Sequence, residues 1–250
     1  MLRFEEIGVF GSSLNYQNEL DSEFRLVMTT RKRKIALIHT SPAAIAPLMR
    51  FYNDAAPELE ITNLLDDGLL RLLAAGDQAT VERRLAEMLT VAVRTYGAEL
   101  GMVTCSSVTK GIVERLAPLF DLPVLKIDYP MAREAVGDGR RRIGIAATFA
   151  PTIAPTSQLI REAAGEAGAE IEIVQEVVPG AYDALLSGDD EAHDELLCSG
   201  VERLAAGGVD VVVLAQISMA RVLPRLEGKV GVPVLTSLHT SLSAIRDALK

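Results

Sequence analysis

The sequence predicts an α/β protein built from two pseudo-symmetric lobes, each containing a parallel sheet, with a cleft between the lobes. Two observations support this prediction. Short apolar runs alternate with stretches of helical periodicity, which is the pattern of βα units around a parallel sheet. The second half of the chain then repeats landmarks of the first half at a nearly constant spacing. Such a repeat indicates two similar units, each within the usual size range of a domain.

The first half contains three predicted strands and two predicted helices. The run IALIH at 35–39 is short and apolar and is followed by polar residues, as expected for a buried parallel strand. Residues 77–97 have apolar side chains at helical spacing and end at Gly97, a residue that commonly terminates helices. There follow a strand GMVTC at 101–105, a helix over 108–120 and a strand LPVLKI at 122–127.

Three segments of the second half match segments of the first half in the same order. RIGIAATFAP at 142–151 matches KIALIHTSP at 34–42 with an offset of 108, which places Thr148 opposite Thr40. VVLAQISMARVLPRL at 212–226 matches the segment that begins at Gly101 with an offset of 111, so that Gln216 stands opposite Cys105 and Ser218 opposite Ser107. VPVLTS at 232–237 matches 122–127 with an offset of 110.

These landmarks predict the domain boundaries. We expect residues 28–131 to form lobe 1 and residues 132–239 to form lobe 2, with 240–250 as a candidate segment that returns to lobe 1. Residues 1–27 have no sustained hydrophobic period, and Glu5 and Glu6 stand where a secretory signal would be apolar. We therefore interpret 1–27 as a poorly ordered N-terminal extension outside the folded unit.

The composition favours a globular protein that does not bind nucleic acid. Of the 250 residues, 49% are hydrophobic and 24% are charged, and the mean hydropathy is +0.23, so the chain can bury a substantial core. The net charge is −9, whereas nucleic-acid binding depends on clustered Lys and Arg.

The sequence also predicts the compartment. No apolar run approaches the roughly 18 residues that a membrane helix needs, so we expect no membrane partner. Two cysteines without a secretory signal favour a reducing interior, and we expect a cytoplasmic protein. The composition is compatible with a homo-oligomer.

The ends of the predicted strands indicate where a site would lie. In open parallel sheets, ligands bind in a crevice at the carboxyl ends of the strands. Thr40, Cys105, Thr148 and Gln216 all follow strands, so we expect them to converge in the cleft. Further candidates at the same edges are His39, Ser106, Ser107, Ser218 and His239.

These candidates also have structural interpretations. A cysteine at a strand end is compatible with an inert buried thiol, and threonines at such positions often cap helices. His39 is suited to act as a general acid or as a carboxylate partner, but a purely structural role is at least as expected for it. Cys198 lies on the apolar face of a predicted helix, and His193 lies in an acidic helix start. We therefore expect Cys198 to pack in the hydrophobic core without a chemical role, and His193 to face solvent.

The two similar lobes, the segment GMVTCSSVTKG at 101–111 and the Ala-Thr turn at 147–148 resemble the aspartate/glutamate racemase superfamily. That superfamily includes amino-acid racemases, hydantoin racemase, maleate isomerase and arylmalonate decarboxylase. The resemblance covers about residues 34–250. It implies one catalytic cysteine in each lobe, on opposite faces of the substrate carbon. Cys105 matches the first cysteine, whereas Gln216 occupies the position of the second, which is a departure from the family pattern.

This resemblance implies proton transfer at a carbon next to a carboxylate. Inverting such a centre requires a base on one face and an acid on the other. A thiol serves when amides at a helix N-terminus lower its ordinary pKa of about 8.5, and we expect a helix beginning near Val108 to act in this way on Cys105. The carboxamide of Gln216 does not ionise near neutral pH, but it can donate a hydrogen bond to a developing enolate oxygen.

Three functions remain open on these grounds. We favour a cofactor-independent isomerase or racemase that acts on a small carboxylate, with Cys105 as acid, base or nucleophile. A decarboxylase of a malonate-type acid is the second, because one thiol suffices to protonate one face. A catalytically degenerate protein that binds a small carboxylate is the third. The sequence has no metal-ligand spacing of His and Cys and no glycine-rich nucleotide motif, so we expect neither a metal nor a cofactor.

Overall fold

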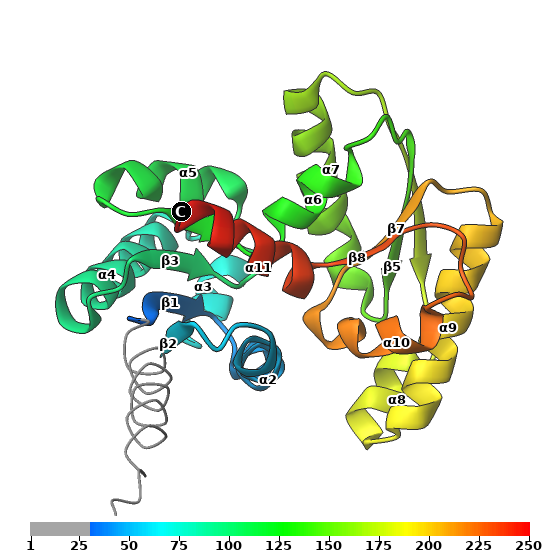
Figure 1. Ribbon diagram of the computed structural model, residues 1–250, viewed down its shortest axis with the longest axis horizontal. Coiled ribbons are helices and arrows are strands. Elements are labelled where there is room, and N and C mark those ends of the chain that lie inside the picture. Colours follow the sequence, from blue (N-terminus) through cyan, green and yellow to red (C-terminus); the bar gives the residue numbers. More distant parts are fainter. Residues whose placement is uncertain (1–30) are drawn as a thin grey trace, which may run out of the picture.

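The computed structural model describes residues 31–250, so the predicted extension at 1–27 lies outside the described residues. The chain forms two four-stranded parallel sheets, with the strand orders β2-β1-β3-β4 and β6-β5-β7-β8. Figure 1 shows the two sheets in separate lobes that lie side by side. The predicted α/β fold with two pseudo-symmetric parallel-sheet lobes is confirmed.

The first sheet and the helices that follow its strands are called lobe 1. Its strands are β1 (Arg33–His39), β2 (Leu59–Leu65), β3 (Leu100–Val103) and β4 (Val124–Lys126). Its helices are α2 (Ile45–Ala55), α3 (Leu69–Ala74), α4 (Gln78–Tyr96) and α5 (Lys110–Leu116), with short 3-10 turns η1 (Pro42–Ala44) and η2 (Ala117–Leu119).

The second sheet and its helices are called lobe 2. Its strands are β5 (Arg142–Ala147), β6 (Glu172–Val177), β7 (Val211–Leu214) and β8 (Val234–Thr236). Its helices are α7 (Ile153–Ala167), α8 (Ala181–Ser187), α9 (Asp190–Ala206) and α10 (Leu223–Leu226), with 3-10 turns η3 (Ala150–Thr152) and η4 (Ile217–Val222). Two further helices, α6 (Tyr129–Ala135) and α11 (Ser237–Ala248), follow the last strand of each sheet.

The strand register reproduces the repeat in the sequence. Between β1 and β3, Ile35 pairs with Leu100, and between β5 and β7, Ile143 pairs with Val211. Position 143 is 35 plus 108, and position 211 is 100 plus 111, which are the two offsets found in the sequence. Equivalent residues of the two halves therefore occupy equivalent places in the two sheets.

Helix α4 shows why the predicted bounds were close. The side chain of Asp77 accepts a hydrogen bond from the Thr80 amide at 3.1 Å and caps the helix, which satisfies an otherwise free N–H group. Gly97 ends the helix with φ at 67°, a left-handed conformation that glycine adopts without steric cost. The sequence analysis does not predict the edge strands β2 and β6, whose side chains are half-buried or exposed apart from the buried Leu59.

Helices α6 and α11 each pack against the core of the other lobe. Met131, Ala132 and Ala135 of α6 belong to the hydrophobic cluster of lobe 2. Leu238, Leu242 and Ile245 of α11 belong to a cluster of lobe 1. Figure 1 shows α11 (red) running from the second lobe across to the first, with α6 close to the junction. The two lobes are therefore tied together by an exchange of equivalent helices.

A buried hydrogen bond anchors α11 in lobe 1. The hydroxyls of Tyr52 on α2 and Ser241 on α11 lie 2.6 Å apart, and both residues are fully buried. Burial raises the pKa of Tyr52 to about 12, so the phenol is neutral and available as a hydrogen-bond donor.

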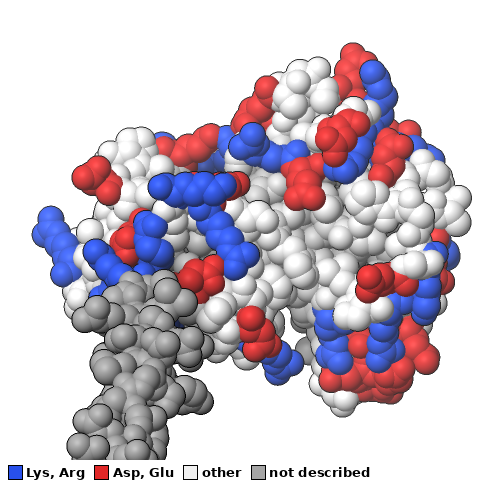
Figure 2. Space-filling model, in the orientation of Figure 1, with Lys and Arg blue, Asp and Glu red and all other residues white. Residues whose placement is uncertain are grey.

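Charged side chains of both signs are interspersed over both lobes on the face that Figure 2 shows. Several form ion pairs between elements, such as Arg246 on α11 with Glu58 at 2.8 Å and Arg115 on α5 with Glu82 at 2.6 Å. Within residues 31–250, no helix is both long and apolar enough to cross a membrane.

We predict that Ser241→Ala lowers the free energy of unfolding by about 1–3 kcal/mol, because it leaves the buried Tyr52 hydroxyl without its main partner. Ser243→Ala on the same helix is the matched control, since Ser243 is exposed, and it should change stability by less than about 0.5 kcal/mol. Urea denaturation of both variants measures the difference. Equal effects would contradict the role given to the Tyr52–Ser241 bond.

Candidate active site

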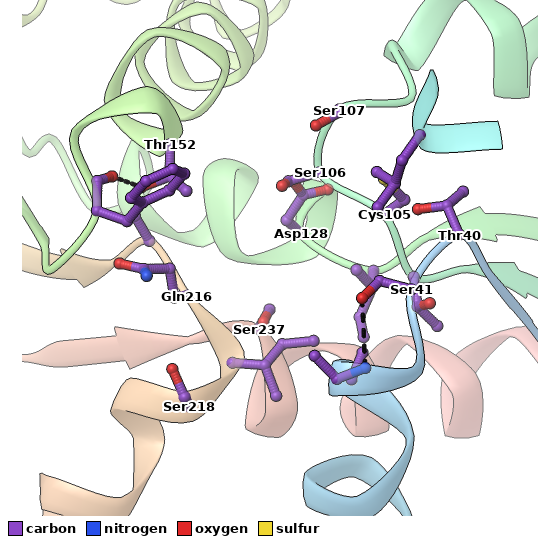
Figure 3. Close-up of a pocket in the computed structure, with 18 of the residues that line it drawn as sticks. Thr40, Ser41, Cys105, Ser106, Ser107, Asp128, Thr152, Gln216, Ser218 and Ser237 are labelled. Atoms are coloured by element: carbon purple, nitrogen blue, oxygen red, sulfur yellow. Dashed lines mark hydrogen bonds between the residues drawn. The ribbon is translucent and has the colours of Figure 1, made fainter. Parts of the chain in front are cut away.

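A cavity of about 520 Å³ lies between the two lobes, within the range of small-molecule sites. It forms because the central strands of both sheets point their carboxyl ends toward the same interlobe space (Figure 3). Its polar lining consists of hydroxyls, one thiol, one amide and one carboxylate, from Thr40, Ser41, Thr104, Cys105, Ser106, Ser107, Asp128, Thr152, Tyr182, Gln216, Ser218 and Ser237. Its apolar lining consists of Ala43, Ala44, Leu70, Ile127, Phe149, Leu185, Leu186, Ala215 and Ile217.

Six of the nine candidate residues line this cavity, namely Thr40, Cys105, Ser106, Ser107, Gln216 and Ser218. Cys105 and Gln216 lie on opposite sides of it and belong to different lobes (Figure 3). The other three candidates, His39, Thr148 and His239, are not part of the lining.

Cys105 stands in the turn between β3 and α5 and is partly exposed to the cavity. The amide of Val108 donates to the carbonyl of Cys105 at 3.3 Å and closes the turn. Helix α5 begins at Lys110, two residues later than expected, and has only seven residues. The thiol is therefore presented by a tight turn ahead of the helix rather than by the first turn of the helix itself.

Gln216 is held by its own lobe. Its Oε1 accepts from the backbone amide of Thr148 at 2.8 Å, and its Nε2 donates to Thr148 Oγ1 at 3.0 Å. The carboxamide is thus fixed against the turn that follows β5, with one N–H of Nε2 left for a ligand. Thr148, a candidate substrate contact, is buried behind Gln216 and positions it.

His39, for which the sequence leaves both a structural role and a role as general acid open, is fully buried behind the lining. Its Nδ1 lies 2.8 Å from Thr104 Oγ1, and its Nε2 lies 2.9 Å from Asn63 Oδ1. Burial lowers the pKa of His39, which favours the neutral ring at neutral pH. Both nitrogens are occupied, so the ring positions Thr104, which does line the cavity, beside Cys105.

The other two histidines also lie outside the described lining. His239 lies at the start of α11, where its Nδ1 is 2.9 Å from Thr236 Oγ1 and its ring meets Phe51 edge-on. His193 is completely buried rather than solvent-facing, with Nδ1 at 2.9 Å from Asp194 Oδ1. Arg221 donates from Nε to Asp194 at 3.0 Å, so this cluster fastens η4, the turn that contains Ser218, to α9.

Sequence reasoning missed a buried ion pair beside the cysteine turn. Lys126, at the end of β4, pairs with the carboxylate of Asp128 and donates to the carbonyl of Ser106 at 3.4 Å. The Lys126 side chain is only 3% exposed, whereas Asp128 lines the cavity. A charged residue inside the otherwise apolar run LPVLKI was the available signal, because a buried charge requires a partner.

The offsets of the repeat would have located further lining residues. Ser237 is the counterpart of Ile127 at an offset of 110, and Thr152 is the counterpart of Ala44 at an offset of 108. All four residues line the cavity. Among residues 31–250, no group of three or more His, Cys, Asp or Glu side chains is arranged to hold a metal ion.

Comparison with known proteins identifies a matching protein family. The family model for Asp/Glu/Hydantoin racemase matches residues 69–245. No curated protein sequence matches the chain.

Solved structures share the fold at low sequence identity. An aspartate racemase homologue from Pyrococcus horikoshii OT3 is 15% identical, with a TM-score of 0.65 over 87% of this chain and 100% of that chain. An allantoin racemase from Klebsiella pneumoniae is 16% identical, with a TM-score of 0.62 over 87% of this chain and 88% of that chain. An arylmalonate decarboxylase is 18% identical, with a TM-score of 0.52 over 86% of this chain and 92% of that chain.

We predict that iodoacetamide at neutral pH modifies Cys105 well before Cys198. Cys105 is open to the cavity, whereas Cys198 is buried in α9 and burial raises its pKa, so its reactive thiolate is scarce. Mass-spectrometric mapping over time measures both rates, and we expect a difference of at least about tenfold. Faster labelling of Cys198 would refute the accessibility assigned to the two thiols.

We also predict that Lys126→Met lowers the free energy of unfolding by about 3–5 kcal/mol, because it leaves the Asp128 carboxylate without its buried partner. The double variant Lys126→Met/Asp128→Leu should recover most of that loss. Lys34→Met is the control, since Lys34 pairs with Glu60 at the surface, and it should cost less than about 1 kcal/mol. Thermal and urea unfolding measure all three, and equal losses for Lys126→Met and Lys34→Met would count against a structural pair.

Proposed function

The chain belongs to the Asp/Glu/hydantoin racemase family, and on this premise we propose that it is a cofactor-independent isomerase or racemase acting at the α-carbon of a small carboxylate. The observation that carries the proposal is the position of Cys105. Its thiol lines the interlobe cavity among the hydroxyls of Thr40, Ser106 and Ser107. An ionisable thiol beside several hydrogen-bond donors is suited to moving a proton next to a carboxylate.

In the proposed reaction the Cys105 thiolate removes the α-proton. The electron pair of the broken C–H bond moves into the carboxylate and gives an enediolate with charge on both oxygens. The hydroxyls of Thr40, Ser106 and Ser107 donate hydrogen bonds to those oxygens, whose charge grows along the reaction coordinate. The proton then returns to the carbon from one face or the other, which decides the stereochemical outcome.

The second face of the carbon needs a proton carrier other than a thiol. Gln216 occupies that side, but its carboxamide does not ionise and is held by Thr148. Among the described residues that line the cavity from lobe 2, Tyr182 is the one with an ionisable side chain. Racemisation therefore routes the second proton through Tyr182 or through water, and Gln216 contributes a hydrogen bond to the enediolate.

Decarboxylation of a malonate-type acid is the second candidate, and the observation that favours it is the single thiol in the cavity. In this reaction the C–C bond to one carboxylate breaks, carbon dioxide leaves, and the electron pair remains on the α-carbon. The Cys105 thiol then donates its proton to one face, so no second carrier is needed. The product is therefore a single enantiomer.

Deuterium oxide separates the two reactions. We predict that a racemase substrate gains deuterium at the α-carbon while both enantiomers accumulate, whereas a decarboxylase releases carbon dioxide and yields one deuterated enantiomer. Amino acids, 2-hydroxy acids and substituted malonates form the test panel, followed by NMR and chiral chromatography. Binding without exchange or turnover across this panel would instead favour a carboxylate-binding protein and contradict the proposed enzyme.

Variants assign the proton carriers. We predict that Cys105→Ala lowers kcat by at least about 10²-fold in either reaction, whereas Cys198→Ala, the matched cysteine control, leaves kcat within about twofold. Tyr182→Phe should slow racemisation and spare decarboxylation. Full activity in Cys105→Ala would remove the thiol from the mechanism.

A further inference from the structure

The two halves of the cavity are chemically unequal, although the scaffold around them is symmetric. Residues related by the repeat line both halves: Ser41 corresponds to Phe149, Thr104 to Ala215 and Ser106 to Ile217. In each of these pairs lobe 1 contributes a hydroxyl and lobe 2 contributes an apolar side chain.

Two related pairs have the opposite pattern, but they do not restore symmetry. Thr152 corresponds to Ala44, and its hydroxyl donates to the carbonyl of Phe149 at 2.7 Å. Ser237 corresponds to Ile127, but it is the first residue of α11, the helix that packs against lobe 1. The pair Ser107 and Ser218 has a hydroxyl in both lobes, and Tyr182 adds a phenol to lobe 2. The Thr104 hydroxyl is engaged by the Ile38 carbonyl and His39. Lobe 1 still presents more hydroxyls to a ligand, from Thr40, Ser41, Ser106 and Ser107, together with the thiol of Cys105.

A wall formed by Leu70, Phe149, Leu185, Leu186 and the ring of Tyr182 borders the cavity. It is called the apolar wall, because the Tyr182 hydroxyl is its one polar side-chain group. The rings of Phe149 and Tyr182 lie 4.8 Å apart and pack together. Leu186 is 69% exposed, and Leu70 and Phe149 are each 40% exposed. Exposed apolar side chains gathered around one cavity indicate a binding surface for an apolar group, because leaving them in water is unfavourable.

The charged residues of the cavity also favour an uncharged substituent. The described lining contains no Lys, Arg or His, and its one charged side chain is Asp128. The nearby cation Lys126 is buried and already bound to Asp128 and to the Ser106 carbonyl. A second carboxylate on the substituent of a substrate would therefore meet the apolar wall without a counter-ion, and desolvating it there is costly.

We propose that the substrate carries an apolar substituent on its reacting carbon and no charged group on that substituent. The reacting carboxylate lies against the hydroxyls of lobe 1, and the substituent lies on the apolar wall, mainly of lobe 2. This inference rests on the proposed function for the identity of the reacting carbon. It separates this chain from enzymes whose substrates carry a second carboxylate on the side chain.

Two ligands of matched size test the inference by binding alone. 2,4-Dimethylpentanoate and 2-methylsuccinate share the same carboxylate, α-carbon and α-methyl group, and differ in an isopropyl group that replaces the second carboxylate. Isothermal titration calorimetry with the wild-type chain should give a Kd at least about tenfold lower for 2,4-dimethylpentanoate. Equal affinity, tighter binding of 2-methylsuccinate, or binding of neither ligand would overturn the inference.

A second experiment places a charge on the apolar wall. Leu186→Arg should reduce the preference for 2,4-dimethylpentanoate by about fivefold, because it removes apolar contact and offers a cation to the second carboxylate. Leu119→Arg is the matched control, since Leu119 is also an exposed leucine, at 67%, and lies on η2 outside the cavity lining. Circular dichroism shows that both variants are folded. An unchanged preference in folded Leu186→Arg would overturn the role of the wall.

The same titrations distinguish failure of this inference from failure of the proposed function. If the apolar ligand binds preferentially and no member of the panel is turned over, the inference holds and the enzyme proposal fails. If aspartate or glutamate is racemised and 2-methylsuccinate binds at least as tightly as its partner, the enzyme proposal holds and this inference fails.

Discussion

The exchange of α6 and α11 between the lobes is the constraint on which the rest of the molecule depends. Each helix follows the last strand of one sheet and buries its apolar face in the core of the other lobe. Because neither lobe has a complete core without the helix of its neighbour, the two sheets are held in one relative orientation. That orientation brings the carboxyl ends of β1, β3, β5 and β7 together, and the cavity follows from it. The buried Tyr52–Ser241 bond locks one of the two helices in place.

Buried polar groups then hold the turns that line the cavity. His39 fixes Thr104 on one side of Cys105, and Lys126 binds Asp128 and the Ser106 carbonyl on the other. In lobe 2, Thr148 fixes Gln216, while the Asp194–Arg221 pair ties η4 to α9. Each of these groups requires a partner once it leaves water, so each of them specifies one conformation of a turn. The lining is thus supported from behind by side chains that do not face a ligand.

A symmetric scaffold here supports an asymmetric site. The strand orders and registers of the two sheets coincide, yet the turns differ in the residues they present. Lobe 1 offers a thiol, a carboxylate and several hydroxyls, and lobe 2 offers an amide, a phenol, the hydroxyl of Ser218 and apolar side chains. This division suits a carbon that bears a carboxylate on one side and an apolar group on the other.

Much of the fold was predictable from the sequence, because it depends on local pattern. The apolar runs of β1 and β3, the cap and glycine end of α4, and the offsets of 108, 111 and 110 are all readable along the chain, and they led to two lobes and to Cys105 opposite Gln216. The edge strands β2 and β6 were not predicted, since half-exposed strands lack a continuous apolar run. Only the tertiary structure decided which polar residues face the cavity. His39 and Thr148 are held away from it by partners such as Asn63 and Gln216, and His193, expected to face solvent, is buried beside Asp194. The Thr148–Gln216 bond joins positions 68 residues apart, and such a contact depends on how the chain packs and not on any pattern within either segment.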